Sequence, residues 1–173
     1  MSLPNVNITL GNGNIGAVTL SDDGIAGLIL TGTAVSSTLE LNKVYVIAST
    51  ADLKKLGLTA ENNPLAYKEV LGFYESAGDG AELHLLVVDA AKTLTEICSM
   101  EAGSPLNTLI DSAAGRIRLV GINRNPDAEY EPTVTSGIDQ DVVTAVTAAQ
   151  QVVESYLKQI APFVVLLPAL AWN

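Results

Sequence analysis

Few side chains in this sequence could perform acid–base or nucleophilic chemistry. The sequence contains one histidine, His84, and one cysteine, Cys98. A histidine can act as a general base, and a thiolate is a strong nucleophile. His84 lies within an apolar run, and no base stands near Cys98 in the sequence to activate a thiol. Both residues are therefore predicted to be structural.

Carboxylates stand close together at two places, Asp22-Asp23 and the pair Asp139 and Asp141. Paired carboxylates can hold a divalent cation. The first pair falls in a predicted turn, and the second falls at a predicted helix start, where acidic side chains are favourable. Neither pair needs a metal to explain it, and we predict no metal site and no other cofactor.

Residues 11–16 match the dinucleotide-binding pattern G-x-G-x-x-G. That function requires a helix directly afterwards, because the amides at its N-terminus hold the pyrophosphate. Residues 17–20 favour a strand instead, and residues 21–24 favour a turn. The pattern predicts a flexible hairpin or arm. A nucleotide-binding domain or small α/β enzyme, with its site at the carboxyl ends of parallel strands, is the alternative from another functional class.

The clearest structural unit spans residues 44–89. Val44–Ala48 and Leu83–Val88 are apolar runs typical of buried strands. Between them, one helix is predicted from Ser49 to Gly57, and a second begins at Asn63-Pro64 and ends at Gly78. A connection of about 30 residues fits a right-handed crossover between parallel strands.

The rest of the chain repeats this alternation of apolar runs and helices. We expect an apolar stretch at 25–30, a surface loop at 31–41, short helices beginning at Thr93 and Ser104, buried strands at 117–122 and 163–167, a mobile loop at 123–137 and a long helix at 139–160. The long helix should bury one stripe made of Val142, Val146, Ala149, Val153, Tyr156 and Ile160. The predicted fold class is α/β, a mainly parallel doubly wound sheet with helices on its faces and an extended N-terminal β arm.

The N-terminal segment has a different pattern from the core. Val6, Ile8 and Leu10 alternate with polar residues, which indicates a half-buried strand. We expect residues 1–24 to form an arm or hairpin and residues 25–173 to form a single core domain.

Composition excludes several functions. A chain of 173 residues with a net charge of −10 is expected to form one domain and to avoid phosphate backbones and anionic membranes. No apolar run reaches the roughly 18–20 residues of a membrane span, and no secretory signal is visible. The single cysteine suits a reducing cytoplasm.

Several segments in the first half resemble the contractile tail sheath proteins of bacteriophages, particularly a sheath-like group found in prophages. The resemblance lies in the order and spacing of Leu3–Gly13, Asp23–Gly32, Asp52–Gly57, Ala66–Val70, Phe73-Tyr74, Gly78 and Gly80–Val88. Members of that family are generally longer and have a C-terminal region with a second interlocking arm. This sequence is therefore expected to be a short member or a C-terminally truncated part of a longer protein.

The resemblance implies a structural protein rather than an enzyme. Sheath subunits form homo-oligomers by strand exchange and stack into a helical tube around a tail tube protein, and contraction drives that inner tube through a cell envelope. In this sequence the exchanged strand would contain Val6, Ile8 and Leu10, with Gly11, Gly13 and Gly16 as its hinge. The expected location is the virion tail, and the host cytoplasm during assembly, without nucleic-acid or membrane partners. The sheath of a related contractile injection or secretion device is a further alternative, which neighbouring genes would distinguish.

Overall fold

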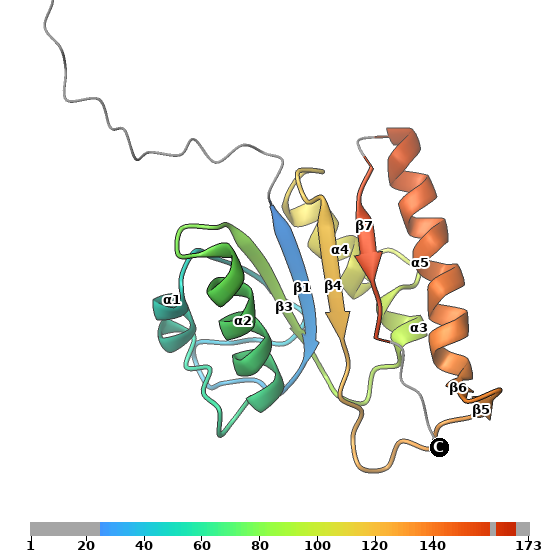
Figure 1. Cartoon of the computed structure of the whole chain (residues 1–173), viewed down its shortest axis with the longest axis horizontal. Helices are drawn as coiled ribbons and strands as arrows, with labels where there is room; N and C mark the ends of the chain where they lie inside the picture. The colour runs from blue at the N-terminus through green and yellow to red at the C-terminus, as the bar shows by residue number, and fades with distance from the viewer. Residues whose placement is uncertain (1–24, 160–161, 169–173) are drawn as a thin grey trace, which may run out of the picture.

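A computed structural model describes residues 25–159 and 162–168, which form a mixed α/β fold around a mostly parallel five-stranded sheet (Figure 1). The strands are β1 (Ala26–Thr31), β2 (Val44–Ile47), β3 (Leu83–Val88), β4 (Leu119–Asn123), β5 (Val134–Thr135), β6 (Ile138–Asp139) and β7 (Val164–Leu166). The helices are α1 (Thr50–Lys55), α2 (Pro64–Ala77), α3 (Leu94–Ile97), α4 (Pro105–Ser112) and α5 (Gln140–Gln159).

The central strand is β1. The strand order is β2-β3-β1-β4-β7, and β1 pairs in parallel with β3 on one side and β4 on the other. Ile29 and Leu30 point to opposite faces of the sheet, and both are fully buried. Burial of both faces explains why this stretch is a continuous apolar run.

The predicted parallel crossover between residues 44–48 and 83–88 is wrong. β2 runs antiparallel to β3, with Val44 opposite Leu86 and Ile47 opposite Leu83. The parallel neighbour of β3 is β1, and β2 lies at the edge of the sheet. The sequence of an apolar strand does not indicate its direction. A connection containing two helices is long enough to place the next strand either parallel or antiparallel to the first.

Helices α1 and α2 cover one face of the sheet beside β1 and β3 (Figure 1). Ala66, Val70 and Tyr74 recur at four-residue spacing, so α2 turns one apolar stripe toward the strands. The predicted bounds of α2 are confirmed, because Pro64 occupies its first turn and Gly78, at φ 78°, follows its last residue.

Helices α3, α4 and α5 pack on the opposite face against Ile29 and Val120. The predicted capping box begins α3: the Thr93 hydroxyl accepts from the Glu96 amide at 3.1 Å, and the Glu96 carboxylate accepts from the Thr93 amide at 2.8 Å. The cap orients the short helix α3 against α5.

The predicted buried stripe of α5 is partly wrong. Val142 and Ala149 are buried, and Val153 and Tyr156 are partly buried against the core, but Ala145 and Val152 complete the inner face, while Val146 is 52% exposed. Ile160 lies outside the described residues. Apolar residues occur in adjacent pairs along this helix, so two neighbouring stripes satisfy the same periodicity. Contact with α3 and β7 selects the stripe that is buried.

A short hairpin lies at the end of the segment predicted to be a loop. β5 and β6 pair antiparallel, with Val134 opposite Asp139, and both residues of the turn, Ser136 and Gly137, have positive φ. Such turns match the twist of paired strands. The hairpin leads directly into α5.

Candidate functional site: an open sheet edge and a buried polar network

The residues predicted to form the inter-subunit arm lie outside the described part of the chain. This applies to Val6, Ile8, Leu10, Gly11, Gly13 and Gly16, and also to Asp22-Asp23. Their roles stay predictions. The described residues can instead be searched for chemistry and for surfaces that such an arm could contact.

His84 is a satisfied core residue on β3. It is 1% exposed, and its two ring nitrogens lie 3.1 Å from the Ser112 hydroxyl and 2.9 Å from a carboxylate oxygen of Glu82. Both nitrogens are therefore occupied by partners within the protein, which leaves neither free to act as a general base.

Cys98 follows α3 and is fully buried. Burial, with a smaller contribution from Asp141, raises the pKa of its thiol to about 12. The thiol therefore stays protonated at neutral pH and packs as a small apolar group.

This environment predicts that Cys98 does not react with thiol reagents in the folded protein. The native chain should react negligibly with a chromogenic disulfide reagent at pH 8, and one thiol should appear when guanidinium unfolds it. Release of colour at the same rate with and without denaturant would show that Cys98 is accessible.

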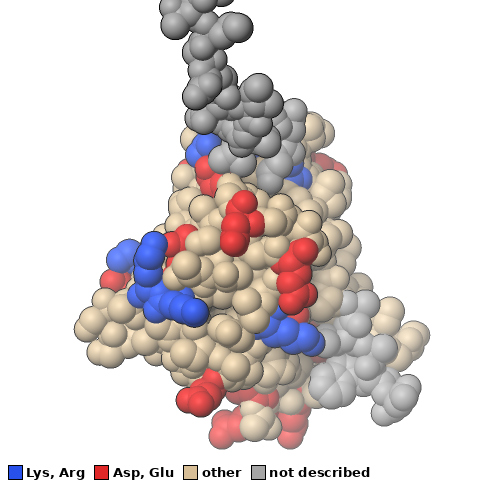
Figure 2. Space-filling view, turned by 60° about the vertical axis from the view of Figure 1, so that its left-hand side comes forward, with Lys and Arg blue, Asp and Glu red and all other residues tan. Residues whose placement is uncertain are grey.

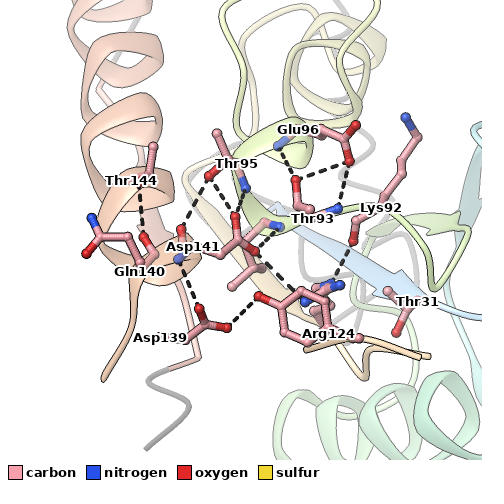
Figure 3. A network of polar contacts seen from close by, with 12 residues as sticks. Thr31, Lys92, Thr93, Thr95, Glu96, Arg124, Asp139, Gln140, Asp141 and Thr144 are labelled. Carbon is pink, nitrogen blue, oxygen red and sulfur yellow. Dashed lines mark hydrogen bonds and ion pairs between the residues drawn. The ribbon is translucent and has the colours of Figure 1, made fainter. Parts of the chain in front are cut away.

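The described residues hold one extensive polar network, centred on Asp141 at the start of α5 (Figure 3). The Asp141 carboxylate accepts hydrogen bonds from the Leu94 amide at 2.8 Å, and from the amide and hydroxyl of Thr95 at 3.0 and 2.7 Å. It thereby caps α3, as a carboxylate at a helix N-terminus should. Asp139 accepts from the Tyr130 hydroxyl at 2.5 Å and also from the Asp141 amide at 3.1 Å. The second carboxylate pair thus serves structural roles.

Arg124, just after β4, is the positive charge of this network. Its Nε donates to the Lys92 carbonyl at 2.6 Å, its guanidinium carbon lies 4.0 Å from the centre of the Tyr130 ring, and its Nη1 lies 3.9 Å from Asp141. Nη1 and Nη2 have no hydrogen-bond partner among the described residues, yet both are enclosed. Because these atoms are enclosed, Arg124 ties β4 to α5 rather than offering an anion site on the surface.

Metal binding and membrane spanning are two further functions on which the described residues bear. None of their histidine, cysteine, aspartate and glutamate side chains gather in threes as a metal site would require. None of the described helices is both long and apolar enough to cross a membrane.

On the face shown in Figure 2, acidic and basic side chains are dispersed among uncharged surface, which is the pattern of a solvated surface.

The most unusual surface lies at β7, which is an edge strand and not the fully buried strand predicted from its apolar sequence. β7 pairs in parallel with β4, and no described strand lies on its other side. Val164 and Leu166 are 57% and 55% exposed. The Val164 amide donates to the Arg118 carbonyl at 3.0 Å, so the backbone groups of Val165 point away from β4.

A groove of about 420 Å³ runs between β7 and α5, and Val146, Val153, Phe163 and Leu167 are among its apolar walls. On the opposite face of the sheet, Leu119 is 42% exposed beside Val164. Helices α1 and α2 pack on that face over β1 and β3. Among the described elements, none covers the part of that face formed by β4 and β7. We call the groove together with Val164 and Leu166 the β7 edge surface.

The sequence did not predict this surface, because an apolar run such as 163–167 has the composition of a buried strand. A signal was present in α5, where residues 142–153 contain no charged side chain although the chain has a net charge of −10. A helix exposed only to water would carry charges on its outer face. Exposed apolar patches bordered by polar surface usually mark interaction sites.

Comparison with known proteins places the chain in a family. No curated protein matches it. A family model described as DUF2586, N-terminal domain, matches residues 3–171, which is nearly the whole sequence. The match includes both the N-terminal segment and the β7 edge. The chain therefore belongs to the DUF2586 family, whose N-terminal domain it contains.

Proposed function

We propose that this chain is a structural subunit of a contractile bacteriophage tail sheath, with a doubly wound core and an N-terminal β arm that links subunits. The subunits would form a helical tube around a tail tube protein in the virion, and its contraction would drive the inner tube through a cell envelope. The protein has no catalytic role in this proposal.

The observation that carries the proposal is the ordered series of segments that resemble sheath-like proteins. Asp23–Gly32 contains β1, Asp52–Gly57 contains the end of α1, and Gly80–Val88 contains β3. These segments are thus parts of one packed core rather than scattered surface matches. The alternation of Val6, Ile8 and Leu10 adds support, because such a strand can join a sheet in another subunit through its backbone.

The contents of the described core favour a mechanical role over an enzymatic one. Its histidine, its cysteine and its second carboxylate pair are all engaged in packing or capping. Its largest unsatisfied feature is an apolar sheet edge, which suits contact between proteins.

Sedimentation velocity of the full-length gene product tests the proposal. A sheath subunit should form large, polydisperse particles at micromolar concentration. A single slow species at every concentration and salt condition tested would oppose a polymerising function.

The rival nucleotide-binding function makes a separate prediction. Addition of NAD or ATP should leave the melting temperature unchanged, because the sequence after Gly16 favours a strand and lacks the helix that would hold phosphate. A saturable rise of several degrees would reverse this view, since a ligand that binds only the folded state stabilises it.

A further inference from the structure

His84 lies between a hydroxyl and a carboxylate where β3 meets α4. Its Nδ1 is 3.1 Å from the Ser112 hydroxyl, and its Nε2 is 2.9 Å from a carboxylate oxygen of Glu82. The histidine is almost fully enclosed, whereas the Glu82 side chain is 25% exposed. A serine, a histidine and an acid in this order have the composition of a hydrolase triad, so the positions of the protons decide what the cluster can do.

The proton of the Ser112 hydroxyl is directed away from the imidazole. Ser112 is the last residue of α4, and its hydroxyl donates to the Leu109 carbonyl at 2.6 Å. Because a carbonyl cannot donate and a hydroxyl has a single proton, the hydroxyl oxygen can only accept at Nδ1 of His84. Nδ1 therefore carries a proton. In a hydrolase triad the direction is the reverse, since the serine hydroxyl donates to the histidine.

Nε2 of His84 carries a proton as well, because it faces a carboxylate. A neutral imidazole with its proton on Nδ1 would direct a lone pair at the ionised oxygen of Glu82, which is unfavourable in an enclosed site. The Arg116 guanidinium lies 3.4 Å from the same oxygen, and a cation at that distance stabilises a carboxylate rather than a neutral acid. The residues opposite His84 in the sheet, Gly27 of β1 and Val46 of β2, carry no charge.

We infer that His84 is a positively charged imidazolium in the folded protein, and that its ion pair with Glu82 is a proton-dependent switch at the contact between β3 and α4. With the proton bound, Nε2 donates to Glu82, and Nδ1 donates to Ser112. Without it, the Ser112 hydroxyl must turn from Leu109 to Nδ1, so the ion pair and one hydrogen bond of α4 are both lost. A Cβ added at Gly27 would lie 2.6 Å from Leu109 Cδ2, so α4 packs closely here and keeps Ser112 beside the imidazole.

The switch gives the stability of the protein a defined dependence on pH. A histidine in an unfolded chain releases its proton near roughly pH 6.5. Above that pH the folded chain binds one proton more than the unfolded chain, so the free energy of unfolding falls as the pH rises, until the folded chain releases the proton too. The ion pair therefore contributes its full stabilisation on the acid side of this range and loses it on the alkaline side.

Nitrogen NMR of the imidazole tests the protonation state directly, because His84 is the single histidine of the sequence and gives one set of ring signals. In the full chain labelled with ¹⁵N-histidine, at about pH 7.5, we expect both ring nitrogens to have the closely similar shifts of an imidazolium. A neutral ring, in which one nitrogen is unprotonated and shifted far downfield, would overturn the inference whichever nitrogen it is.

Glu82→Gln separates the ion pair from simple packing, because the amide keeps an oxygen that can accept from Nε2 and removes the charge. This variant should have a neutral His84 ring at the same pH, and it should lack the fall in the urea midpoint that the unaltered chain shows between about pH 6 and about pH 8. Glu131→Gln, the same change at an exposed acid, should keep both properties. Circular dichroism verifies that each variant is folded.

Two results with these chains would contradict the switch. An imidazolium that persists in folded Glu82→Gln would show that Glu82 does not hold the proton. A urea midpoint of the unaltered chain that falls no more than that of Glu82→Gln over the same pH range would show that the proton does not stabilise the fold. If Glu82→Gln does not fold, the spectrum of the unaltered chain still decides whether His84 is charged.

Discussion

Replacing Ile8 with aspartate is expected to abolish tube formation by the full-length protein while leaving the fold of the core unchanged. In the proposed assembly, Ile8 enters an apolar site on another subunit, where a carboxylate without a partner would be strongly unfavourable. None of the strands and helices formed by the described residues includes Ile8. Electron micrographs should therefore lack tubes, and the free energy of unfolding of the 173-residue chain should change by less than about 0.5 kcal/mol.

Asn7→Asp is the matched control, because it adds the same charge one residue away on the opposite side of the alternating strand. It should impair assembly much less. If Ile8→Asp unfolds the isolated chain by several kcal/mol, the segment is an ordinary core strand. If tubes form as readily with Ile8→Asp as without it, the segment does not link subunits.

The largest effect on stability is expected from Asp141→Ala. This change removes the carboxylate that caps α3 and leaves the enclosed Arg124 without its nearest negative partner. Removing one member of a buried ion pair typically costs about 3–5 kcal/mol. Urea unfolding followed by circular dichroism should show a loss of that size.

The double variant Arg124→Met, Asp141→Asn separates the two causes. It removes both charges and keeps a side-chain oxygen that can accept from the α3 amides, so it should recover a large part of the lost stability. Glu131→Ala, at an exposed acid outside the network, should change stability by less than about 0.5 kcal/mol. A similarly small effect for Asp141→Ala would show that the network does not hold α3 to α5.

Local signals predicted much of the core. Asn63-Pro64 and Gly78 define the ends of α2, and the Thr93 and Glu96 pair defines the start of α3, because capping depends on residues close in sequence. The apolar runs at 83–88, 117–122 and 163–167 locate three strands of the sheet within one or two residues. Alternation of these runs with helices indicates the mixed α/β class.

Features that depend on distant partners could not be predicted. The direction of β2 is set by its pairing with β3, and the buried stripe of α5 is set by contacts with α3 and β7. Arg124 and Asp141 are brought together from opposite ends of a loop and a hairpin, so neither residue signals the other in the sequence.

The open edge is the most instructive case. Phe163–Leu167 has the composition of a buried strand, yet Val164 and Leu166 are exposed in the described part of the chain. An apolar edge that is exposed in one chain and buried in an assembly looks the same in sequence as a central strand. The sequence thus contained the composition of this exposed apolar surface without its position in the sheet.

Electron microscopy of the full-length gene product tests the central claim most directly. The account predicts hollow tubes with regular cross-striations, formed by stacked rings of subunits and lost when Ile8 is replaced by aspartate. A folded product that yields only isolated small particles, over a range of concentrations and salt conditions, would contradict it.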